Sequence, residues 1–116
     1  MYQFEVIMKK LFILLFLFSS LASASEANPT KITQVLSGPS FGKQVLITLE
    51  EQPTGIPACH NNQWYNYVFD GTTPEGQITL SMVLTAYASQ NKVWIAGMDN
   101  CTLRGGVESL KHIVLK

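Results

Sequence analysis

Residues 72–89 read TTPEGQITLSMVLTAYAS. Thr73 is a good N-cap residue, Pro74 suits the first helical position, and Glu75 places a carboxylate near the positive end of the helix dipole. Asn91 can adopt the left-handed conformation that often closes a helix. Apolar side chains recur at helical spacing over a wide arc, and they are Ile78, Leu80, Met82, Val83, Leu84 and Tyr87. The stretch therefore predicts the one substantial helix downstream of residue 24.

Strand-like segments lie on both sides of this helix. Three precede it and two follow it, at residues 31–36, 43–50, 64–69, 93–96 and 107–115. Residues 25–30 are small and polar with a proline, so we expect them to form a loose lead-in. The order strand, strand, strand, helix, strand, strand is that of the OB-fold. The sequence predicts a β-rich α+β domain, an OB-fold-like five-stranded barrel with one helix between strands 3 and 4. A different α+β sheet with one packed helix stays open.

The amino-terminal end has the pattern of a secretory signal peptide. Lys9 and Lys10 form a basic region, residues 11–18 are apolar, and Ala22 and Ala24 form an Ala-x-Ala cleavage site. The apolar run is shorter than the ~20 residues needed to cross a bilayer, so a retained anchor is the weaker alternative. We expect residues 1–24 to be removed, no stable membrane insertion after cleavage, and one small exported domain over residues 25–116, periplasmic or secreted. Glu5 suits such a leader poorly, so a translation start at Met8 stays open.

The charge balance of residues 25–116 excludes some partners. The whole chain has eight basic and eight acidic residues, and removing Lys9, Lys10 and Glu5 leaves six and seven. A net charge near minus one gives no electrostatic attraction for nucleic acid, so no nucleic-acid partner is expected.

Cys59 and Cys101 are the only cysteines of the chain. In an oxidising compartment such a pair predicts a disulfide, which we expect to stabilise the fold by about 4 kcal/mol. A redox pair and a metal site are weaker alternatives, because there is no Cys-x-x-Cys spacing and too few further ligands.

The sequence offers no convincing catalytic constellation, so we expect a protein that is not an enzyme and binds no cofactor and no metal. His60 and His112 could act with a cysteine only if the disulfide were absent. A carboxylate pair for glycoside hydrolysis would depend on a separation that the sequence does not give. The candidates for that pair are Asp70, Glu75, Asp99 and Glu108.

Aromatic residues give the better functional signal. Tryptophan and tyrosine at a surface often mark contact sites, because they combine apolar area with a polar tip. The candidate ligand or partner surface comprises Trp64, Tyr65, Tyr67 and Trp94, although core packing is the default role of each.

Several of these segments carry a resemblance. Cys59, residues 64–70, residues 84–89, residues 93–95 and Cys101 together resemble a group of small exported bacterial proteins, most without a characterised activity. More distantly, the chain is similar to the OB-fold B subunits of bacterial AB-type toxins, of the subtilase-cytotoxin and pertussis-like kinds. That resemblance implies ring-shaped homo-oligomers that bind glycans, with the helices lining the pore. It implies no site residues, because no sugar-binding motif matches.

The sequence therefore predicts a non-enzymatic exported binding module that recognises a glycan or a protein and can form a homo-oligomer. The alternative is a stand-alone periplasmic accessory or inhibitor protein that acts through protein contacts. A small hydrolase is the third and weakest hypothesis.

Overall fold

The structure, a computed structural model, describes residues 24–116. The predicted leader lies outside the described residues, apart from Ala24. In chain order the elements are β1 (Glu26–Thr30), β2 (Ile32–Leu36), the 3-10 turn η1 (Pro39–Phe41), β3 (Gln44–Leu49), β4 (Tyr67–Asp70), α2 (Pro74–Ser89), β5 (Val93–Gly97) and β6 (Glu108–Leu115). Within this part of the chain, no helix is long and apolar enough to cross a membrane.

The strands form one six-stranded mixed sheet in the order β1-β5-β6-β4-β3-β2. All neighbours pair antiparallel except β4 and β6, which run parallel, with Tyr67 opposite Glu108. The domain is therefore the predicted β-rich α+β domain with one helix. It differs from the predicted five-stranded barrel, because an additional strand, β1, precedes the first predicted strand, which is β2, and the sheet is not a closed barrel. The helix consequently lies between the fourth and fifth strands.

The prediction of a loose lead-in over residues 25–30 is wrong, since these residues form β1. Glu26 pairs with Ala96, and Ala27 pairs with Ile95 on β5. Ala27 and Thr30 are buried, so the strand contributes to the core despite its polar composition. Pro29, which cannot donate to a ladder, is tolerated because β1 is an edge strand.

Strand β4 is shorter than predicted, and it is covered on both faces. Tyr67 and Phe69 point into the main core, while Val68 packs with Leu46 and Val107 in a second apolar cluster. Because both faces of β4 are buried, its apolar residues follow one another without the polar alternation of a half-exposed strand.

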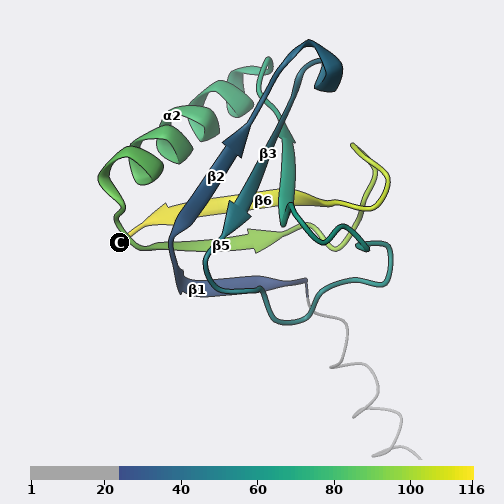
Figure 1. Cartoon of the computed structure of the whole chain (residues 1–116), viewed down its shortest axis with the longest axis horizontal. Coiled ribbons are helices and arrows are strands. Elements are labelled where there is room, and N and C mark those ends of the chain that lie inside the picture. The colour runs from purple at the N-terminus through teal and green to yellow at the C-terminus, as the bar shows by residue number, and fades with distance from the viewer. Residues whose placement is uncertain (1–23) are drawn as a thin grey trace, which may run out of the picture.

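Helix α2 begins as predicted, and it packs over the sheet against β2 and β6 (Figure 1). The Thr73 side chain accepts a hydrogen bond of 2.9 Å from the Gly76 amide. A Cβ atom on residue 76 would overlap the Asp70 carbonyl oxygen, so glycine permits this close approach of helix to strand. The helix closes at Gln90, which adopts the left-handed conformation predicted for Asn91.

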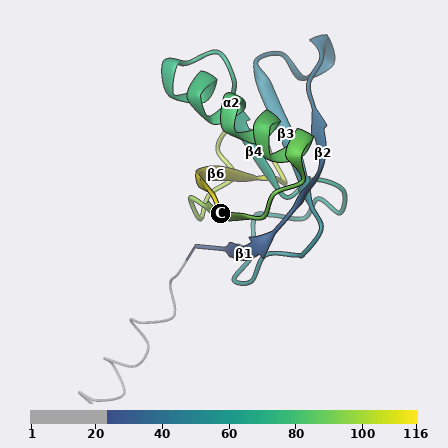
Figure 2. The same cartoon turned by 90° about the vertical axis from the view of Figure 1, so that its left-hand side faces the viewer.

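Only part of the predicted apolar arc of α2 is buried. Val83 and Ala86 are fully buried in the core, whereas Ile78, Leu84 and Tyr87 are exposed. In both ribbon views, β1 lies on the side of the molecule away from α2 (Figures 1 and 2). The exposed helix surface and the amino-terminal strand are therefore separate surfaces.

The predicted disulfide is confirmed, with a Cα–Cα distance of 6.0 Å between Cys59 and Cys101. It joins the long loop before β4 to the loop before β6. Hydrogen bonds of 3.0 Å from the amides of Asn61 and Asn62 to the Gly106 carbonyl hold the same two loops together. The covalent and polar contacts fix the position of the chain as it enters β6.

Candidate functional site

The four aromatic residues of the predicted surface lie in different places. Tyr67 is fully buried in the core, and Tyr65 is half-buried against the second apolar cluster. Trp64 is 71% exposed in the loop before β4, where its carbonyl oxygen accepts a hydrogen bond of 2.6 Å from Thr48 Oγ1. Trp94 is half-buried on β5 and lines a hollow in the surface. Of these four residues, Trp64 is the most exposed, and only Trp94 lines one of the two hollows described below.

We call this hollow the amino-terminal groove. It has a volume of about 500 Å³ and lies where the start of the described chain passes β5 and β6. Its lining comprises Ala24, Ser25, Glu26, Thr54, Gly55, Trp94, Ala96, Gly97, Lys111 and His112. The groove combines one indole, one imidazole, one ammonium group and one carboxylate with hydroxyl groups and backbone.

Two contacts fix the orientation of Trp94. Its Nε1–H donates to Glu26 Oε2 at 3.1 Å. The imidazole of His112 meets the indole edge to face, with the ring centroids 4.7 Å apart and an interplanar angle of 77°. A Trp side chain held in this way loses little conformational entropy when a ligand packs against it.

The imidazole of His112 has one unpaired nitrogen. Within the described residues, its Nε2 atom is buried and has no hydrogen-bond partner. Most buried polar atoms have a partner in the protein or in ordered water. The contact of His112 with the groove is therefore made through its ring rather than through this nitrogen.

A buried polar cluster lies at the base of the groove, and we call Ser25, Tyr67 and Glu108 the Glu108 cluster. The Ser25 hydroxyl donates to Glu108 Oε1 and lies 2.7 Å from the Tyr67 hydroxyl. Glu108 Oε2 accepts from the amide of Asp99 at 2.9 Å. Glu108 is 1% exposed, and Ser25 and Tyr67 are completely buried. Burial raises the pKa of the Tyr67 phenol to about 12, and the nearby carboxylates of Glu108 and Glu26 act in the same direction.

The sequence indicated Glu108 only as one candidate for a carboxylate pair, and it indicated Ser25 only as the residue after the predicted cleavage site. Gly97 is the one residue whose type reflects the burial of Glu108, because a Cβ atom at position 97 would overlap the Glu108 carboxylate. That overlap depends on the antiparallel pairing of β5 with β6, which places Gly97 opposite Leu110. The sequence alone does not give this register.

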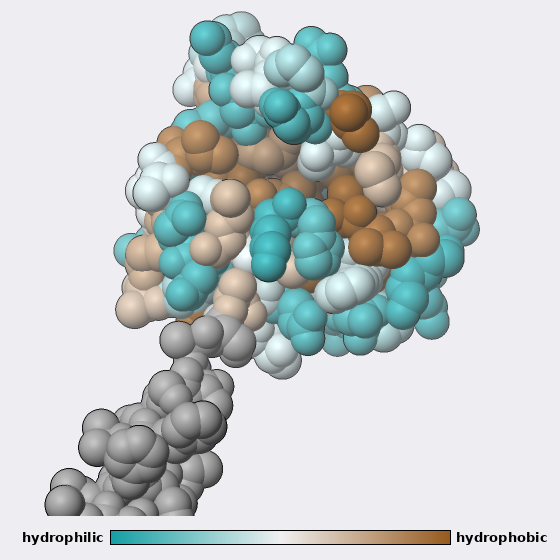
Figure 3. All heavy atoms as spheres, turned by 180° about the vertical axis from the view of Figure 1, so that it is seen from behind, coloured by the Kyte–Doolittle hydropathy of each residue, from teal (hydrophilic) through white to brown (hydrophobic). Residues whose placement is uncertain are grey.

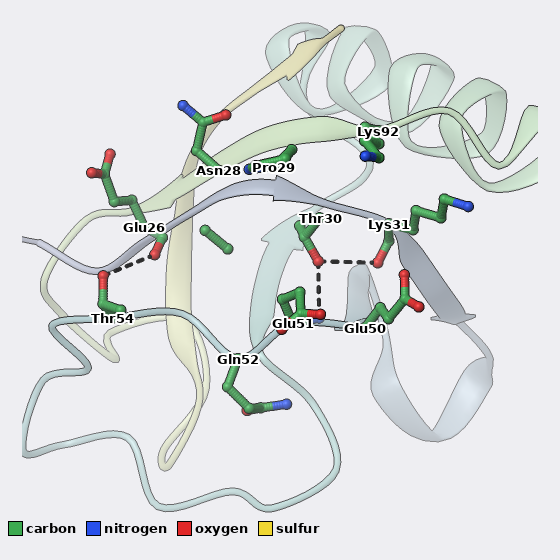
Figure 4. A pocket seen from close by; sticks show the side chains of 11 residues that line it. Glu26, Asn28, Pro29, Thr30, Lys31, Glu50, Glu51, Gln52, Thr54 and Lys92 are labelled. Atoms are coloured by element: carbon green, nitrogen blue, oxygen red, sulfur yellow. Dashed lines mark hydrogen bonds between the residues drawn. The ribbon is translucent and has the colours of Figure 1, made fainter.

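A second hollow lies on the other side of β1 (Figure 4). It has a volume of about 660 Å³, and charged side chains line much of it, including Lys31, Glu50, Glu51 and Lys92. Thr30 Oγ1 accepts from the Glu51 amide at 3.0 Å. Two backbone hydrogen bonds between Glu26 and Thr54, of 3.0 and 2.9 Å, separate this hollow from the amino-terminal groove.

The other histidine and acid candidates have structural contacts. His60 Nδ1 accepts the Glu108 amide at 3.0 Å, which fixes the first residue of β6. Asp70 Oδ1 accepts from the Thr72 amide at 2.8 Å and from the Thr72 hydroxyl at 2.6 Å, and these hydrogen bonds lower the pKa of Asp70. Glu75 lies in the first turn of α2, as predicted. No group of three or more potential metal ligands is found in residues 24–116.

Exposed apolar side chains form a further feature of the surface, and Figure 3 shows one face on which hydrophobic and hydrophilic side chains lie side by side. On α2 the exposed fractions are 65% for Ile78, 48% for Leu84 and 43% for Tyr87. Between Gly76 and Asn91 the sequence has no charged residue.

Comparison of the chain with protein-family models, with curated proteins and with solved structures finds no match.

Proposed function

We propose that this chain is an exported, non-enzymatic binding module that recognises a glycan through the amino-terminal groove. The observation that carries the proposal is the half-buried Trp94, whose indole is held by Glu26 and His112 inside a concave site with a mixed polar and apolar lining. An aromatic ring can pack against the apolar face of a sugar, while surrounding polar groups bind its hydroxyls.

The strand connections support an OB-fold-like interpretation. Only Lys31 separates β1 from β2, so these strands are halves of one amino-terminal segment, which pairs with β5 and with β3. In the sheet, β1 and β2 are the two edge strands, and the parallel pair of β4 and β6 lies between them. OB-folds bind oligosaccharides and oligonucleotides, and the slightly acidic charge balance favours the sugar. The proposed likeness to the glycan-binding B subunits of AB-type toxins agrees with this choice.

The test is a glycan array probed with the wild-type protein and two variants. Trp94→Ala removes the aromatic surface of the groove, and Trp64→Ala is the matched control, because it removes a more exposed tryptophan outside the groove. We expect loss of the bound glycans with Trp94→Ala and retention with Trp64→Ala. No glycan bound by the wild type, or equal effects of the two variants, would contradict the proposal.

A second candidate function rests on the exposed surface of α2. Large apolar side chains that lie together at a surface often mark a protein contact. Leu84 and Tyr87 are three residues apart and lie on one side of α2, and no charged residue between Gly76 and Asn91 would repel an identical surface, so we propose a second copy of this chain as its occupant. A homo-oligomer would present several grooves at once and raise the avidity for a glycan-bearing surface.

A stand-alone accessory or inhibitor protein is the alternative to this homo-oligomer. It would be monomeric by light scattering and would recover one defined partner from a periplasmic extract. A self-associating chain would scatter as a multimer without any partner.

A further inference from the structure

The Glu108 carboxylate is buried without a cationic partner among the described residues. Its hydrogen-bond donors are the Ser25 hydroxyl and the Asp99 amide, and neither group carries a charge. The hydrogen bond between His60 and Glu108 involves the backbone and not the carboxylate, because His60 Nδ1 accepts from the Glu108 amide. Removing a carboxylate from water is costly unless a positive charge and hydrogen bonds compensate for it.

Ser25 stands at the predicted cleavage point and is already fixed by the fold. It is completely buried, and its carbonyl oxygen accepts the Gly97 amide at 2.9 Å, which extends the pairing of β1 with β5 by one residue. The preceding residues Ala22 and Ala24 form the Ala-x-Ala pattern. Ala24 lines the amino-terminal groove, so the scissile bond lies at the groove wall.

We propose that the Glu108 cluster is a binding site for the α-ammonium group of Ser25, which forms when the leader is removed. The inference rests on the export part of the proposed function. Hydrolysis of the Ala24–Ser25 amide adds one water, leaves a carboxylate on Ala24 and leaves an amine on Ser25. With an ordinary pKa of about 8, that amine takes up a proton at neutral pH. An endopeptidase that recognises small residues before the cleaved bond catalyses this hydrolysis.

The geometry places the new charge next to its partner. The Ser25 nitrogen is three bonds from Oγ, and Oγ is hydrogen-bonded to Glu108. The nitrogen therefore lies within about 6 Å of the carboxylate, a range in which opposite charges interact strongly. Capture of a chain amino terminus by a fixed polar site is an established mode of peptide recognition. Processing thus supplies the cation that the buried carboxylate lacks.

The proposal gives the leader a role in stability as well as in targeting. Before cleavage, the position of the Ser25 nitrogen holds a neutral amide, and no residue from 24 to 116 supplies Glu108 with a cation. After cleavage, the ion pair fastens Ser25, the residue just before β1, to the first residue of β6. The processed chain is then more stable than the same chain with its leader attached.

The first test uses the full chain, expressed with its leader and purified from the exported fraction. Intact mass should show a product that begins at Ser25. Acylation of the α-amine near neutral pH, followed by peptide mapping, then measures its protection. We expect native protein to react at least about tenfold more slowly at Ser25 than protein unfolded in urea, because the paired amine must first be released by local opening.

The matched variants are Glu108→Gln and Glu26→Gln. Both remove an acid near the groove, but Glu26 contacts Trp94 rather than Ser25. Glu108→Gln should abolish the protection of the Ser25 amine, and Glu26→Gln should keep it. Equal reactivity of native and unfolded wild type, or equal protection in both variants, would overturn the proposal.

An insertion tests the same pair without changing Glu108. One alanine inserted between Ala24 and Ser25 keeps the cleavage pattern and moves the ammonium one residue away, while the Ser25 hydroxyl remains. We expect a melting temperature lower by roughly 5 °C. An unchanged melting temperature, or a wild-type product that begins at another residue, would refute the inference. None of these readouts involves a glycan, so they can succeed or fail independently of the array.

Discussion

The carboxylate of Glu108 lies against the backbone of Gly97. It occupies the position that a Cβ atom on residue 97 would take. Gly97→Ala must therefore displace a carboxylate that is buried and hydrogen-bonded on both oxygens. We expect a loss of unfolding free energy of about 1–3 kcal/mol, measured by urea denaturation. Gly105→Ala is the control, because a Cβ atom there meets nothing within 4 Å and should change stability little. Equal losses in the two variants would contradict this packing argument.

Removal of the disulfide should cost about 4 kcal/mol, because Cys59 and Cys101 close a loop with a sequence separation of 42. The measurement is urea denaturation with and without a thiol reductant. The double variant Cys59→Ser/Cys101→Ser should match the reduced wild type and should not respond to the reductant. A wild type that is equally stable in both conditions would show that the two loops are held by their hydrogen bonds alone.

The phenol of Tyr67 should make stability depend on alkaline pH. Its pKa is about 12 in the folded state and about 10 in an unfolded chain. The folded-state pKa is raised, so this contribution is complete below pH 10 and is lost as pH rises toward about 12. We expect the unfolding free energy of the wild type to fall more steeply over this range than that of Tyr67→Phe.

Below pH 10, Tyr67→Phe should be less stable by about 1 kcal/mol, since it loses the hydrogen bond with Ser25. Parallel pH profiles for the two proteins would exclude Tyr67 as the titrating group. A titration of tyrosinate absorbance gives an independent check, because the variant should lack the last group to ionise.

A charge on the exposed surface of α2 should prevent self-association. Leu84→Glu places a carboxylate on the proposed contact, and Ile56→Glu is the control, because Ile56 is also exposed but lies in the loop before β4. We expect sedimentation velocity to show multimers for the wild type and for Ile56→Glu, and monomers for Leu84→Glu. Circular dichroism should give the same secondary structure for all three proteins. A monomeric wild type would leave the helix surface without its proposed occupant.

The sequence predicted those parts of the fold that short-range chemistry controls. Thr73 and Pro74 mark the start of α2, the predicted strand at residues 43–50 contains β3, and the pair of cysteines predicts the disulfide that the structure contains. Strand β1 escaped prediction because Ala27 is its only buried apolar residue. Its strand conformation depends on pairing with β5, which composition cannot reveal.

The candidate site was harder to predict than the fold. Trp64 and Trp94 carry the same chemical signal in the sequence, but only the tertiary structure places Trp94 in the groove and Trp64 in an exposed loop. Glu108 reads as an ordinary charged residue at a strand end. Its burial follows from the parallel neighbour β4, from Gly97 opposite its side chain and from the amino-terminal segment that covers it.

The pairing of β1 with β5 also constrains the order of folding. Glu26 is among the first described residues to be synthesised, yet its partner Ala96 follows 70 residues later. The amino-terminal strand has an isolated bridge to Thr54, but it must wait for its neighbour in the sheet until most of the domain exists. High contact order of this kind slows folding and delays its cooperative completion until the chain is nearly whole. A nascent chain of this sequence should thus remain unfolded, and competent for translocation, for as long as β5 has not emerged.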